Sequence, residues 1–146
     1  MEERIMLKTG IEELNSLIVI YGKGGSYKSS LGISLLNNSD KNCCLITADN
    51  HNYINIKDNV KVIDYNDEVN NEIVIHCIKE YDITLIDYKE VFKITNEELI
   101  KLKEIAKNNN NTLIVISCCS SKNDLTNNNH YEELKEIADL MIITDK

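Results

Sequence analysis

The chain has 146 residues and a mass of 16.7 kDa, which is the size of one domain. Its net charge of −8 excludes a basic footprint for nucleic acid spread over the whole sequence. The longest apolar run, Leu17–Tyr21, is far too short to cross a bilayer, and the N-terminus lacks the basic start and apolar block of a secretory signal. We therefore expect one soluble, cytoplasmic domain over residues 1–146.

Short apolar runs alternate with longer segments of helical period along the chain. The runs are continuous instead of alternating between apolar and polar residues, which is typical of parallel strands that are covered on both faces. The expected strands are Leu17–Tyr21, Cys43–Ala48, Val60–Tyr65, Ile83–Tyr88, Thr112–Cys118 and Leu140–Thr144.

Helices are expected in the segments between these runs. The first runs from about Tyr27 to Asn37, directly after the first strand, and Asp67 can cap a second. Thr95 and Glu98 have the spacing of a capping box and open a third helix, and a fourth begins near Tyr131. Strand–helix alternation repeated this often predicts an α/β fold of three layers with a mostly parallel sheet and right-handed crossovers.

Neither the cysteines nor the histidines have the spacing of a metal site. The five cysteines form no C-x-x-C pair and lie in or near apolar segments, so we expect small buried thiols in a reducing compartment. Of the three histidines, His76 is expected on a helix surface, and His51 and His130 are expected in loops.

The most informative segment joins the first strand to the first helix. Three of the five glycines fall between positions 22 and 25, where they let successive backbone N–H groups curl into an anion nest beside a helix N-terminus. Lys28 is placed to reach terminal phosphates, and the Ser29 hydroxyl is placed to bind Mg²⁺. The segment resembles the Walker A motif, G-x-x-x-x-G-K-[ST], although Tyr27 stands where the last glycine belongs. A glycine turn with a surface lysine is the alternative. The predicted contacts to ATP are Gly22, Lys23, Gly24, Gly25, Ser26, Tyr27, Lys28, Ser29 and Ser30.

Acidic residues at two strand ends complete the predicted site. The strand before Asp87 is apolar, as in a Walker B element, and Asp87 is predicted to hold Mg²⁺ together with Ser29. A solvated aspartate that only ends the strand is the alternative. Asp49 ends another strand and is a candidate to orient or deprotonate the attacking water, although a capping or turn role is an alternative. Ser117 and Cys118 end a further strand and are candidate sensors of the γ-phosphate side.

With these residues in place, the chain resembles a RecA-like P-loop ATPase of the RadA, RadB and KaiC branch. Thr9–Asn15 is similar to that branch's TGI-x-x-L-D segment, and Ile46–Asp49 resembles the strand that ends in the family's catalytic glutamate. The resemblance implies a P-loop NTPase fold, ATP and Mg²⁺ as ligands, and a protein partner or a homo-oligomer. It also implies that Lys28 neutralises charge on the γ-phosphoryl group while Asp49 orients water.

The departures from this family point to a reduced member. The segments that correspond to DNA-binding loops, Lys89–Ile94 and Ser120–His130, are short and contain no arginine, and Arg4 is the only arginine of the chain. DNA contact is therefore expected only locally or through partners. The expected function is an ATP-binding accessory or paralogue subunit in DNA repair or recombination, with weak hydrolysis.

Two other functions stay open. Residues 23–29 also resemble the deviant Walker A motif of the ParA and MinD group, K-G-G-x-G-K-[ST], in which Lys23 would reach the nucleotide of a dimer partner. The segment Thr9–Asn15 has no place in that group, and the chain is much shorter than its members. A non-hydrolysing nucleotide-binding interaction module is the remaining alternative, and Tyr27 favours it.

Overall fold

The computed structural model describes six stretches of the chain: residues 16–24, 27–47, 56–64, 71–87, 92–119 and 124–144. Several sequence predictions fall outside these stretches, namely those for Thr9–Asn15, Gly25, Ser26, Asp49, His51 and Asp67.

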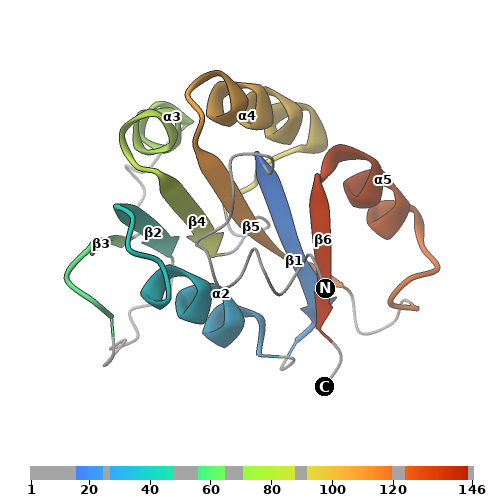
Figure 1. Cartoon of the computed structure of the whole chain (residues 1–146). Coiled ribbons are helices and arrows are strands. Elements are labelled where there is room, and N and C mark those ends of the chain that lie inside the picture. The colour runs from blue at the N-terminus through green and yellow to red at the C-terminus, as the bar shows by residue number, and fades with distance from the viewer. Residues whose placement is uncertain are drawn as a thin grey trace.

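The described residues build one six-stranded sheet in which every pair of neighbouring strands is parallel (Figure 1). The strand order is β3-β2-β4-β5-β1-β6. This confirms the predicted α/β fold with a parallel sheet. The strands are β1 (Leu17–Lys23), β2 (Cys43–Thr47), β3 (Val60–Asp64), β4 (Ile83–Asp87), β5 (Thr112–Cys119) and β6 (Leu140–Thr144).

Four helices of the described stretches cover the two faces of the sheet, which gives the three predicted layers. In Figure 1, α2 lies on one face, and α3, α4 and α5 lie on the other. The helices are α2 (Lys28–Asn37), α3 (Asn71–Glu80), α4 (Asn96–Asn108) and α5 (Asn129–Ile137). None of the described helices is long and apolar enough to span a membrane.

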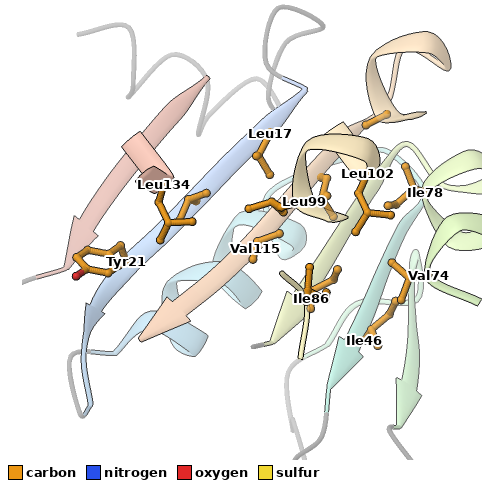
Figure 2. Close-up of a cluster of buried hydrophobic side chains, with 14 of the residues drawn as sticks. Leu17, Tyr21, Ile46, Val74, Ile78, Ile86, Leu99, Leu102, Val115 and Leu134 are labelled. Atoms are coloured by element: carbon orange, nitrogen blue, oxygen red, sulfur yellow. The ribbon is translucent and has the colours of Figure 1, made fainter. Parts of the chain in front are cut away.

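Two separate hydrophobic clusters follow from the alternation of side chains along the strands. The cluster between the sheet and the three helices α3, α4 and α5 includes Leu17, Ile86 and Val115 from the strands and is drawn in Figure 2. The cluster under α2 takes neighbouring strand positions, among them Ile18 and Leu85. Because both faces are buried, the central strands are apolar at nearly every position.

Side-chain caps explain where two of the helices begin. The capping box of α4 is confirmed: the Glu98 N–H donates to Thr95 Oγ1 at 3.1 Å, and the Thr95 N–H donates to Glu98 Oε1 at 3.0 Å. Asn128 caps α5 by accepting the Tyr131 N–H at 2.8 Å. The helix therefore starts before Tyr131, and His130 lies in its first turn, so the prediction of a loop residue is wrong there.

Gly32 brings α2 close to the sheet. A Cβ atom at this position would lie 2.9 Å from Leu85 Cδ2 and 3.3 Å from Ile116 Cδ1, which are both buried. A larger residue would push the helix outward. The glycine therefore sets the distance between the sheet and the helix that carries Lys28 and Ser29.

Candidate phosphate-binding site

The junction between β1 and α2 forms the core of the candidate site. β1 continues to Lys23, past the predicted end at Tyr21, because Gly22 and Lys23 are in register with Cys118 and Cys119 of β5. The chain leaves the sheet in a turn at Gly24. The described part of the junction is therefore a strand that ends at Lys23, a turn, and a helix that begins at Lys28.

Tyr27 has a left-handed backbone conformation, with φ 63° and ψ 30°, at the position where the Walker A motif has its last glycine. Glycine adopts this conformation without steric cost, whereas an L-residue with a Cβ pays about 1–2 kcal/mol. The backbone at Tyr27 thus has a conformation that favours glycine, although the residue is a tyrosine.

The N-terminus of α2 opens toward this junction. The first i→i−4 hydrogen bond of α2 runs from the Leu31 N–H to the Tyr27 carbonyl, at 3.1 Å. The backbone amides of positions 28–30 come before this bond and are the first-turn amides of the helix. No acidic residue lies in the first turn of α2, and Tyr27 makes no side-chain cap. The positive end of the helix dipole is therefore available to an anion from outside the helix.

Lys28 folds back over the junction. Its side chain is buried, with 6% of its surface exposed, and its Nζ donates to the Lys23 carbonyl at 2.6 Å. This contact places a buried positive charge at the turn between strand and helix. A phosphate bound at the N-terminus of α2 would lie beside this ammonium group.

Ser29 and Asp87 meet although 58 positions separate them in the sequence. The Ser29 hydroxyl donates to Asp87 Oδ1 at 3.1 Å, and Asp87 is 2% exposed at the carboxyl end of β4. Asp87 follows Ile83 and Leu85 on the face that α2 covers, which explains the contact. One hydroxyl and one carboxylate are oxygen ligands that suit Mg²⁺ when substrate phosphates supply others.

Thr47 is a neighbour that the sequence analysis missed. It is in register with Asp87, completely buried, and on the same face of the sheet, at the end of β2. The signal in the sequence was a polar threonine at the carboxyl end of an apolar run. Asp49, two positions further, lies outside the described residues, so its predicted role remains a prediction.

Ser117 faces away from the phosphate side. Its Oγ lies 3.1 Å from His130 Nε2, on the face that α5 covers, and the Tyr21 ring packs beside His130 at a centroid distance of 6.1 Å. Asn128 Nδ2 donates to the Tyr21 hydroxyl at 3.1 Å. Ser117 therefore belongs to a polar cluster under α5, and its place does not fit the predicted sensor role. Cys118, the other candidate, is in register with Gly22.

The cysteines behave as buried thiols. No disulfide forms among the five, and all except Cys118 are buried. Burial raises the pKa of the Cys43 thiol to about 11, and the contact with Cys77 together with burial raises the pKa of Cys44. Within the described stretches, no group of three or more His, Cys, Asp or Glu side chains could hold a metal ion.

Comparisons with known proteins support the fold. No protein-family model matches the sequence, and no curated protein is significantly similar to it. Among solved structures, 118 chains match, including the crystal structure of the RadB recombinase. That match has a TM-score of 0.61 at 15% sequence identity and covers 88% of this chain and 73% of the RadB chain. The chain therefore shares its α/β fold, with a parallel sheet covered on both faces, with the RadB structure.

Proposed function

We propose that this chain is a single RecA-like domain that binds ATP and Mg²⁺ at the junction of β1 and α2. The observation that carries the proposal is the contact of Ser29 Oγ with Asp87 Oδ1 at 3.1 Å, directly after the buried Lys28. A glycine turn with a surface lysine does not account for a lysine that is 6% exposed. Such a turn also does not account for the hydrogen bond between the Ser29 hydroxyl and the buried Asp87 carboxylate.

Each residue has a defined task in this proposal. The backbone of residues 22–30 and the N-terminus of α2 hold the phosphates, and Lys28 moves from the Lys23 carbonyl to the terminal phosphate. Ser29 and Asp87 hold Mg²⁺, which when bound neutralises phosphate charge. Asp49 orients water, and hydrolysis is weak or depends on a partner.

The biological setting is proposed from the fold likeness to a recombinase. An accessory or paralogue subunit in DNA repair or recombination, acting with a protein partner or as a homo-oligomer, is consistent with that likeness. The net charge of −8 favours contact with DNA through partners.

A ParA- or MinD-type dimeric switch is the second candidate, and Lys23 separates the two. In the switch, the Lys23 side chain acts on the partner's nucleotide. In the RecA-like site, the Lys23 backbone carbonyl accepts a hydrogen bond from Lys28 Nζ, and the Lys23 side chain has no such task. Lys23→Ala keeps that carbonyl, so a RecA-like site tolerates the change and a switch does not.

Calorimetric titration with ATP and Mg²⁺ tests the proposal. We expect wild type to bind and Lys28→Ala to lose about 30-fold or more in affinity, because a charge-assisted contact to phosphate is lost. Lys101→Ala, an exposed lysine on α4, is the matched control and leaves affinity unchanged. Asp87→Asn reduces the gain in affinity that Mg²⁺ gives.

Phosphate release separates an enzyme from a binding module. Turnover that disappears in Lys28→Ala supports an ATPase. Binding without turnover, even with partners added, supports a non-hydrolysing module. Absence of binding by the wild type contradicts the proposal itself.

A further inference from the structure

Tyr27 presents a large aromatic ring to solvent beside the candidate site. Its side chain is 70% exposed, the highest value among the large apolar side chains of the described residues. The other two exposed ones lie elsewhere. Ile100 is on α4, and Ile143 is in register with Tyr21, whose side chain faces α5. Within the described stretches, Tyr27 is thus the one large exposed apolar side chain on the α2 side of the sheet.

The backbone at this position does not favour tyrosine. Tyr27 has φ 63°, in the region where glycine and asparagine are the tolerated residues. Because 70% of the side chain is exposed, burial of the ring offsets little of the cost of that conformation. A residue that is strained and unburied, directly before the phosphate lysine, fits a role in contact with a ligand.

The directions of neighbouring side chains show which part of a ligand the ring can meet. Lys28 turns inward to the Lys23 carbonyl, and Ser29 turns inward to Asp87. A polyphosphate held by these two groups occupies the inner part of the site. The rest of a nucleotide then extends toward solvent, where the Tyr27 ring is exposed.

We propose that the Tyr27 ring stacks on the base of the bound nucleotide and so selects a nucleotide over a simple polyphosphate. This inference rests on the proposed function, because it needs phosphates at the N-terminus of α2. Every base has a flat π-face, so the contact contributes affinity without requiring a particular base. Tyr27 is then a specificity-determining residue at the position where the motif has glycine.

Parallel titrations with ATP and with inorganic tripolyphosphate, both with Mg²⁺, test this inference. Tyr27→Asn removes the ring but tolerates the left-handed backbone, and Tyr27→Phe keeps the ring. We expect Tyr27→Asn to lose about 5- to 100-fold in affinity for ATP, as for other base–aromatic stacks, with tripolyphosphate affinity unchanged. Tyr27→Phe should bind both ligands as the wild type does.

The remaining outcomes overturn the inference. If Tyr27→Asn binds ATP as well as the wild type, the ring does not contact the base. If it loses ATP and tripolyphosphate equally, Tyr27 acts on the loop and not on the base. In both cases the proposed phosphate site still stands if the wild type binds tripolyphosphate and Lys28→Ala does not. If the wild type binds neither ligand, the proposed function is wrong as well.

Discussion

Cys43 begins β2, and its environment couples protein stability to alkaline pH. The thiol is completely buried and donates to the Lys41 carbonyl at 3.3 Å. Burial raises its pKa from 9.0 to about 11, an effect only partly offset by the hydrogen bond with Ser39. In the unfolded chain the thiol ionises near pH 9, whereas in the folded chain it stays protonated until about pH 11.

The sign of the pH effect follows from proton binding. Between about pH 9 and 11 the folded state holds more protons than the unfolded state, so stability falls as pH rises. We expect Cys43→Ala to lose less unfolding free energy than wild type between pH 8 and pH 10.5, as measured by urea denaturation with reductant present. Ile18→Val, a buried change on the same face, should shift stability equally at both pH values. Parallel curves for wild type and Cys43→Ala would contradict this coupling.

The sequence shows that Tyr27 stands where the Walker A motif has glycine, but it does not show which backbone conformation this tyrosine adopts. The glycine-like conformation persists in a residue that does not favour it. Sequence alone identified Lys28, Ser29 and Asp87 as candidates, because a glycine-rich turn between strand and helix and an acid at a strand end are local patterns. The 3.1 Å contact between Ser29 and Asp87 depends on how α2 lies over the sheet, which no local pattern contains.

At the scale of elements, the N-cap of α5, Asn128, does more than the N-cap of α4, Thr95. Asn128 also joins α5 to β1, the strand that leads into the candidate site. Both residues cap a helix, through the Tyr131 N–H and the Glu98 N–H respectively. Asn128 also donates from Nδ2 to the hydroxyl of the buried Tyr21 and to the Asp124 carbonyl. Its loss therefore removes a cap and a tertiary hydrogen bond together.

Replacing these two caps should have unequal effects. Thr95→Ala should lower the free energy of unfolding by about 1 kcal/mol, the usual value for an N-cap. Asn128→Ala should lower it by about 2–3 kcal/mol, because it also removes the tertiary hydrogen bond from Asn128 Nδ2 to the Tyr21 hydroxyl. Asn128→Asp keeps the capping oxygen and removes the donor, so its value should lie between the two. Urea denaturation measures all three, and equal values for the alanine variants would contradict the tertiary role.

The sequence predicted the six strands that the structure describes because each reads as an apolar run, including the partly exposed edge strands β3 and β6. Among the described residues, the bounds differ at the ends of two strands: β1 extends to Lys23 and β5 extends to Cys119, and these two residues are in register. The strand order β3-β2-β4-β5-β1-β6 was not predictable, since each crossover can reach several positions in a sheet. Alternation along β5 places Ser117 on the face that α5 covers, where its Oγ lies 3.1 Å from His130 Nε2. His130 lies in the first turn of α5 because the helix is capped by Asn128, so the loop prediction for His130 is wrong.

At the scale of the whole molecule, the charge distribution opposes direct binding of nucleic acid. The net charge is −8, and on α5 three carboxylates, Glu132, Glu133 and Glu136, stand beside a single lysine, Lys135. A protein gains affinity for DNA by neutralising phosphates with cations, and a net negative surface repels the polyanion at long range. A role in recombination therefore requires a partner that supplies the contact with DNA.

Fluorescence anisotropy with a labelled single-stranded oligonucleotide tests this requirement. With ATP and Mg²⁺ at about 150 mM salt, we expect the isolated chain to bind more weakly than about 10⁻⁴ M, the weak end of non-specific binding. A triple variant, Glu132→Lys, Glu133→Lys and Glu136→Lys, serves as the positive control. It exchanges three exposed carboxylates for cations and should bind measurably, with an affinity that falls steeply as salt is added. Submicromolar binding by the wild type would mean that local lysines such as Lys93 suffice, and that the chain reaches DNA without a partner.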